Sequence, residues 1–221
     1  MIASMNRSPF GVCKFVYLLV WAAGCHPAED GPGTVRPSVQ DSLEAPPAKL
    51  SQWGFFVGPI AQLNPAPGVV PYQVASPLWA DHAGKARFIV LPEGQTANVG
   101  DDGEWSFPVG TIVIKSFYHS ADRRAPDTSA TLVETRLLIK DTDERKGHTY
   151  VWNADHSDAV RRIAGARLAL EYTDTDGHEQ QQEYIVPNTN QCKDCHEIDD
   201  RSRLLGLVGR QLDRTVRRDG V

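Results

Sequence analysis

Methionine is nearly absent from this 221-residue chain, in which Met1 and Met5 are the only two examples. A methionine ligand to a metal is therefore excluded for the rest of the chain. Apolar runs of about 20 residues, the length that spans a membrane as a helix, are also missing. The formal net charge is −5, which gives no support for nucleic-acid binding. Gly-x-Ser-x-Gly, phosphate-loop and Gly-x-Gly-x-x-Gly motifs do not occur, so the sequence offers no signal for those hydrolases or nucleotide-binding proteins.

Cysteine is scarce too, and the chain has only Cys13, Cys25, Cys192 and Cys195. Residues 192–196 read Cys-Lys-Asp-Cys-His, which is the attachment motif of c-type haem. Two thiols at this spacing can bond to the two vinyl groups of one haem, and His196 can supply the proximal nitrogen to iron. We expect one covalent haem c. A Cys192–Cys195 disulfide is an alternative, and a zinc site has less support because a second Cys/His pair is missing.

The N-terminus has the features of an export signal. Arg7 and Lys14 precede an apolar run at 15–23, which ends in Gly24-Cys25. This order predicts a secretory signal peptide over residues 1–24, with a retained membrane anchor as the alternative. Ala22-Ala23-Gly24-Cys25 also resembles a bacterial lipobox. We therefore expect lipidation of Cys25 and a protein tethered to a membrane in the periplasm or cell envelope.

Composition divides the remaining chain into three parts. Residues 25–48 are rich in proline and poor in large apolar side chains, which predicts a flexible linker. Residues 49–187 are long enough to form one well-buried domain. Residues 188–221 form the haem-attachment segment.

Alternation of apolar and polar residues predicts that the domain is mainly β. In the segment 131–140, Val133, Thr135, Leu137 and Ile139 fall on one face, whereas Glu134 lies on an opposite, partly wet face. Further strands are expected at 111–118, 87–91, 149–152, and at 167–173 and 179–186, which flank a glycine-containing turn. Many short strands with turns between them favour an antiparallel sandwich or a partly open barrel. A short helix is predicted after the haem motif, within residues 201–218.

The iron would need a sixth ligand other than methionine. Among the histidines outside the motif, His82 and His119 are the better candidates, although a surface or hydrogen-bonding role is the more common one for any histidine. Bis-histidine coordination would give a low potential compared with His/Met coordination. An open sixth position would instead allow small molecules to bind.

An ordered series of short stretches spans about residues 50–215. They are Val70-Pro71-Tyr72, Ser76-Pro77-Leu78-Trp79-Ala80-Asp81, Lys85-Ala86-Arg87-Phe88, Phe107-Pro108-Val109-Gly110-Thr111, Lys115-Ser116-Phe117-Tyr118, Glu134-Thr135-Arg136-Leu137-Leu138, Tyr150-Val151-Trp152-Asn153 and Val186-Pro187-Asn188-Thr189-Asn190-Gln191-Cys192. In this order they resemble a poorly characterised family of exported bacterial c-type haem proteins. The resemblance implies a β-rich domain before a haem segment, with electron transfer as the role. Family members continue beyond the region similar to 206–212, which implies that a segment covering the haem is either missing here or supplied by another polypeptide, such as the redox partner.

The function expected from these features is single-electron transfer by an exported monohaem protein that meets a redox partner. A peroxidase-like haem enzyme with an open sixth site is the second hypothesis. A non-redox β-sandwich binding module, with Cys192 and Cys195 joined in a disulfide, is the third.

Overall fold

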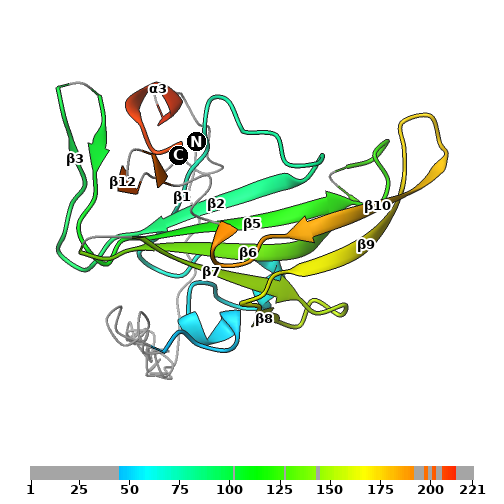
Figure 1. Ribbon diagram of the computed structural model, residues 1–221, viewed down its shortest axis with the longest axis horizontal. Helices are drawn as coiled ribbons and strands as arrows, with labels where there is room; N and C mark the ends of the chain where they lie inside the picture. The colour runs from blue at the N-terminus through cyan, green and yellow to red at the C-terminus, as the bar shows by residue number, and fades with distance from the viewer. Residues whose placement is uncertain are drawn as a thin grey trace, which may run out of the picture. The chain divides into compact units, whose positions relative to one another are not determined.

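The computed structural model describes residues 45–101, 103–126, 128–142, 145–191, 197–198, 201–202 and 206–212. All of them belong to one structural unit, which spans residues 34–221. The described part is mainly β, with antiparallel sheets and a short helix near the C-terminus (Figure 1). This confirms the predicted fold class. The main sheet is open rather than a closed barrel, since its order runs β1-β2-β5-β6-β7-β8.

The strands of the main sheet are β1 (Val69–Pro71), β2 (Gly84–Val90), β5 (Ile112–Ser120), β6 (Ala130–Lys140), β7 (Arg145–Trp152) and β8 (Ala159–Arg161). Three two-stranded pairs accompany it, formed by β3 (Asn98–Val99) with β4 (Trp105–Ser106), β9 (Ala166–Thr173) with β10 (Glu179–Val186), and β11 (Glu197–Ile198) with β12 (Arg201–Ser202). The described helices are η1 (Leu50–Trp53), η2 (Ile60–Gln62) and α3 (Gly209–Leu212).

One face of the main sheet is covered by the chain that precedes β1. Ile114 of β5 and Leu137 of β6 are buried there against Leu50 and Trp53 of η1. The indole Nε1 of Trp53 donates a hydrogen bond of 2.8 Å to the Tyr150 hydroxyl. That hydroxyl donates in turn to the carbonyl of residue 47, also at 2.8 Å. Because apolar burial and a buried hydrogen-bond chain both join η1 to β7, this segment is part of the folded core.

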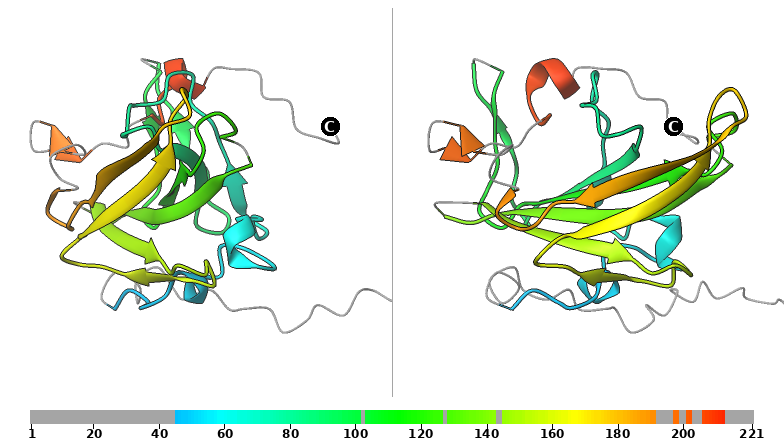
Figure 2. Two further views of the ribbon diagram at one scale, coloured as in Figure 1. Left: turned by 90° about the vertical axis from the view of Figure 1, so that its right-hand side faces the viewer. Right: turned by 45° about the vertical axis from the view of Figure 1, so that its right-hand side comes forward.

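The β9–β10 hairpin packs on the opposite face of the sheet, where its strands lie alongside the green strands in Figure 2. Tyr184 and Val186 of β10 are buried against Phe117 and Val133. The Tyr184 hydroxyl donates to a carboxylate oxygen of the fully buried Glu134 at 2.6 Å. A further apolar cluster is centred on three buried residues, Phe107, Val113 and Leu207.

A β-bulge between Phe117 and Tyr118 of β5 changes the predicted face assignment of β6. Phe117 pairs with Glu134 and Tyr118 pairs with Leu132, so Val133 is the extra residue. Val133 consequently packs under the β9–β10 hairpin, whereas Leu132 contacts the η1 side. The prediction was wrong for Val133 and Leu132 because an extra residue reverses the alternation beyond it. It was wrong for Glu134 as well, since the hairpin buries the face expected to be partly wet.

The helix predicted within 201–218 is much shorter in the described residues. Arg201 and Ser202 pair with Glu197 and Ile198 as a strand, and the helix α3 covers Gly209–Leu212 alone. Backbone hydrogen bonds fix α3 in place, from Gly209 to the carbonyl of residue 103 at 2.9 Å and from residue 75 to the carbonyl of Gln211 at 2.8 Å.

Candidate functional site

Most residues predicted to carry the chemistry lie outside the described residues. These are Cys192, Cys195 and His196 of the haem motif, Cys25 at the lipidation site and the predicted signal over 1–24. The chain just before the motif is well anchored. Gln191 and Asn188 exchange two backbone-to-side-chain hydrogen bonds of 3.0 Å each. The motif therefore follows directly from a fixed turn at the end of β10.

His82 lies in a tight turn before β2. Both Asp81 and His82 have left-handed backbone conformations, with φ of 46° and 64°. The His82 side chain is exposed, and its ring meets the exposed Trp79 edge to face at 4.3 Å. An exposed imidazole on a solvent-facing turn has the surface role that is most common for histidine.

His119 is the more enclosed of the two candidate ligands. It is buried near the end of β5, and its ring packs against Tyr172 of β9 at 5.4 Å. Its Nε2 has no hydrogen-bond partner among the described residues. Burial lowers the pKa of His119, and the charges of Arg123 and then His82 lower it further. The structure thus places the two candidates within electrostatic reach of each other, and the surroundings of His119 favour its neutral form.

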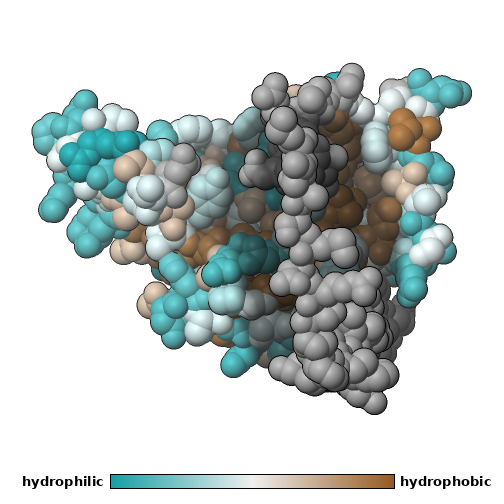
Figure 3. Space-filling model, turned by 180° about the vertical axis from the view of Figure 1, so that it is seen from behind, coloured by the Kyte–Doolittle hydropathy of each residue, from teal (hydrophilic) through white to brown (hydrophobic). Residues whose placement is uncertain are grey.

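A large apolar cavity lies elsewhere, beside β1 and β2. Its volume is about 690 Å³, within the range of roughly 300–1,000 Å³ typical of ligand sites. On the face seen from behind, hydrophobic side chains gather in a hollow (Figure 3). The residues that line the cavity are Val70, Pro71, Tyr72, Gln73, Lys85, Ala86, Arg87, Phe88, Ile89, Trp105, Phe107, Tyr118, Leu207 and Leu212.

Two cations, two phenols and the amide of Gln73 supply most of the polar part of this lining. Burial raises the pKa of Tyr72 to about 12, although the Arg87 charge opposes that shift. Burial also lowers the pKa of Arg87. The pKa of Lys85 is lowered by burial and, in addition, by the nearby charges of Arg87 and Arg136. The Lys85 ammonium donates to the carbonyl of Leu78. Two partly desolvated cations beside an apolar wall form a site suited to an apolar ligand that carries anionic groups.

These residues fit a haem group in chemical terms. A haem is a flat apolar ring with two propionate carboxylates, and the cavity offers aromatic walls beside Lys85 and Arg87. Two of its lining residues, Leu207 and Leu212, come from the segment that follows the haem motif. Neither His82 nor His119 is among the lining residues. Histidine and methionine are absent from that lining as far as the described residues show it.

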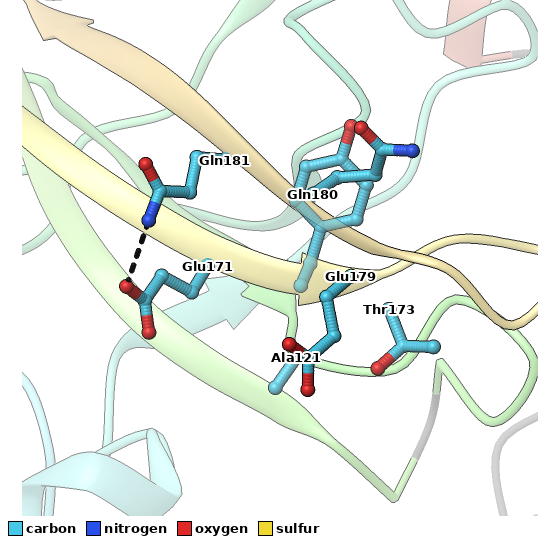
Figure 4. A pocket seen from close by; sticks show the side chains of 7 residues that line it. Ala121, Glu171, Thr173, Glu179, Gln180 and Gln181 are labelled. Atoms are coloured by element: carbon cyan, nitrogen blue, oxygen red, sulfur yellow. Dashed lines mark hydrogen bonds between the residues drawn. The ribbon is translucent and has the colours of Figure 1, made fainter.

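A second cavity, of about 500 Å³, is polar and lies on the β9–β10 hairpin (Figure 4). Its wall includes the exposed side chains of Glu171, Glu179 and Gln181, and the Gln181 amide donates to Glu171 at 3.2 Å. In the adjoining turn, Asp174 accepts two backbone hydrogen bonds of 2.9 Å, from Asp176 and His178. These are the hydrogen bonds of an ordinary hairpin turn.

Comparison with family models, curated proteins and solved structures gave no match to this chain. In the part of the chain that the structure describes, no helix is long and apolar enough to cross a membrane. Sequence reasoning did not single out the cavity as a site. Yet Tyr72, Lys85, Arg87 and Phe107 all belong to stretches that carried the family resemblance. Their presence in these stretches was the one indication in the sequence, and the fold is needed to show that the four residues line the same cavity.

Proposed function

We propose that this chain is an exported c-type haem protein that passes single electrons. Cys192 and Cys195 would hold the haem through thioether bonds, and His196 would bind the iron. The observation that carries the proposal is the Cys-x-x-Cys-His sequence at 192–196, which directly follows a folded β domain whose last hairpin strand ends at Val186. A lipid on Cys25 would hold the protein at a membrane in the periplasm or cell envelope, where it would meet a redox partner.

The haem, when bound, supplies the one-electron couple, and the protein supplies attachment, orientation and a dry environment. Gln191 and Asn188 fix the chain that enters the motif. The apolar cavity would exclude water from the ring, and its two cations would bind carboxylates. Covalent attachment suits such a carrier, because a cofactor in a dilute compartment must not diffuse away.

Co-expression of the full chain with a cytochrome c maturation system tests this proposal. We expect a coloured product whose mass is larger by one haem, and a haem-dependent peroxidase stain that survives a denaturing gel. The double variant Cys192→Ser/Cys195→Ser should lose both signals while the β domain still folds, as judged by circular dichroism. A colourless wild-type product of unmodified mass would reject the haem function and favour the disulfide-bonded binding module.

A second candidate function is a haem enzyme with an open sixth position. It is supported by the lining of the apolar cavity, which contains neither histidine nor methionine among the described residues. A high-spin ferric spectrum that shifts on cyanide addition would favour this enzyme. A low-spin ferric spectrum that is indifferent to cyanide would favour the electron carrier and a protein-derived sixth ligand.

A further inference from the structure

We propose that the apolar cavity beside β1 and β2 is the seat of the haem, and that Arg87 and Lys85 bind its propionates. This inference rests on the proposed function, because it concerns where a haem attached at Cys192 and Cys195 would lie. Binding of the haem in this cavity requires that the motif can reach it, that its walls suit a flat aromatic ring, and that its charges suit two carboxylates.

The chain after the motif leads to the cavity by a short route. Glu197 directly follows the motif and pairs with Ser202 across the β11–β12 hairpin, so their Cα atoms are about 5 Å apart. Ser202 is five residues from the cavity-lining Leu207, a span of at most about 18 Å. The Cα atom of Glu197 therefore lies within roughly 23 Å of that of Leu207, compared with roughly 36 Å for the same ten residues fully extended. The hairpin thus shortens the path from the residue that follows the motif to this cavity.

The segment beyond the motif is also fixed against the cavity. Leu207 is buried, and Glu104 forms a backbone bridge with Val208 next to it. Ser76 donates a hydrogen bond of 2.9 Å to the Gln211 side chain at the other end of the segment. Because these contacts come from both sides, they hold Leu207 and Leu212 as one wall of the cavity.

The walls suit a planar apolar group. Trp105 and Phe107 have nearly parallel rings, with an interplanar angle of 26° and centroids 6.1 Å apart. Tyr72 packs in the same apolar cluster. A flat aromatic macrocycle gains both burial and offset stacking against such side chains. The polar cavity on the β9–β10 hairpin has no comparable wall.

The positive charges of the cavity favour a ligand that carries anionic groups along one edge. Arg87 and Lys85 are both half-buried and lie two residues apart on β2, where the alternation of a strand places them on the same face. Charge-assisted hydrogen bonds from a guanidinium or an ammonium to carboxylates are about twice as strong as neutral ones. A propionate pair at this edge would offset the repulsion between the two cations.

The four tryptophans that follow the predicted signal peptide lie at different places in the fold, so their NMR signals can report the position of the haem iron. Trp105 lines the cavity, Trp79 contacts His82, and Trp53 and Trp152 are buried on the η1 side of the sheet. The ferric holoprotein is labelled at the tryptophan indole nitrogens and studied by NMR. The paramagnetic iron broadens each indole signal, and this broadening falls steeply with distance from the iron. We expect the Trp105 signal to be lost and the Trp53 and Trp152 signals to persist, relative to the haem-free Cys192→Ser/Cys195→Ser variant. Trp105→Phe assigns the signal.

Selective loss of the Trp79 signal would overturn the inference, because it would place the haem beside His82 instead. Equal broadening of all four signals would overturn it too. In both cases the haem is attached, so the proposed function would stand. Absence of attached haem would instead defeat the proposed function.

A second measurement probes the cations. Arg87→Gln removes a positive charge from the haem edge, which should shift the midpoint potential to a more negative value. Arg167→Gln is the matched control, because Arg167 is exposed on β9 and pairs with Glu183. We expect its potential to equal that of the wild type. An unchanged potential in Arg87→Gln holoprotein would contradict the role given to Arg87.

Discussion

His148 shows how burial can set the charge state of a single side chain. It lies on β7, and its Nε2 is buried without a hydrogen-bond partner among the described residues. Burial lowers the pKa of His148 to about 4, and the nearby charges of Arg161 and Lys146 add to this shift. The imidazole is therefore mainly neutral in the folded protein at neutral pH.

This shift makes stability depend on pH in a defined direction. An unfolded histidine has a pKa of about 6.5, so between pH 6.5 and 4 the unfolded chain binds a proton that folded His148 does not. The contribution is fully present above pH 6.5 and is lost as the pH falls towards 4. We predict that His148→Gln reduces the loss of unfolding free energy across this window by roughly 1–3 kcal/mol. Urea denaturation at several pH values measures it.

His178→Gln serves as the control for this experiment. His178 is exposed at the β9–β10 turn, so its replacement should leave the slope of the wild-type profile in place. His119 keeps its own lowered pKa in both variants, and some pH dependence will therefore remain. Identical slopes in His148→Gln and wild type would show that burial of His148 does not set its charge.

Residue-level patterns in the sequence predicted exposure poorly where a distant strand intervenes. Glu134 alternates with apolar neighbours and was therefore placed on a partly wet face. Its carboxylate is covered by Tyr184, which lies 50 positions along the chain. Alternation reports which residues share a face of a strand, but it does not report what packs on that face.

At the scale of elements, β2 and β5 fit together through one glycine. Gly84 pairs directly with Tyr118, whose ring lies over the glycine. A Cβ atom added at Gly84 would come within 2.0 Å of the Tyr118 ring. Glycine is needed here because an aromatic ring occupies the space of a side chain.

Gly84→Ala should therefore destabilise the protein by about 1–3 kcal/mol through overpacking. In the Tyr118→Leu background the same substitution should cost much less, because the ring that it meets is gone. A double-mutant cycle from urea denaturation measures the coupling between the two positions. If Gly84→Ala costs the same in both backgrounds, the close approach of ring and backbone does not control this pairing.

Local signals predicted the longer elements well and the shorter ones poorly. The strands expected at 167–173 and 179–186 match β9 and β10 within one residue, because eight alternating residues on each side of a turn specify a hairpin. The three-residue strands β1 and β8 were not foreseen, since so few residues show no period. Residues 201–202 were expected to begin a helix, but in the structure they form a strand that pairs with Glu197 and Ile198.

For the whole molecule, the segment before β1 completes one side of the core. Leu50, Trp53 and Phe55 are each 2% exposed or less. Their burial against β5 and β6 is a contact between parts of the chain far apart in sequence. The sequence marked this region as the start of the domain, but it carried no periodic signal to show which face it would cover.

Trp53→Ala should cost about 3–5 kcal/mol of unfolding free energy, because it leaves a large cavity and removes the hydrogen bond to Tyr150. Trp79→Ala is the matched control. Its side chain is 70% exposed, and the change should stay within about 0.5 kcal/mol. Chemical denaturation of both variants measures the difference. Similar costs at the two sites would show that η1 is not part of the core.

The apolar cavity is also a whole-molecule feature. Its lining comes from β1, β2, the β4 region, β5 and the segment around α3. The haem motif could be recognised from five adjacent residues, whereas a cavity assembled from five separate segments requires the fold. For this reason the sequence predicted a cofactor but could not point to the cavity that we propose as its binding site.

The open order of the main sheet leaves two edge strands, β1 and β8, and such edges can recruit strands from other molecules. At β8, Lys49 forms a backbone bridge with Val160, and the amide of Arg161 donates to the carbonyl of residue 48 at 2.9 Å. At β1 the edge is three residues long and ends in Pro71, which has no amide hydrogen to donate. One edge of the main sheet is thus occupied and the other is too short to act as a template, which protects this sheet against edge-to-edge aggregation.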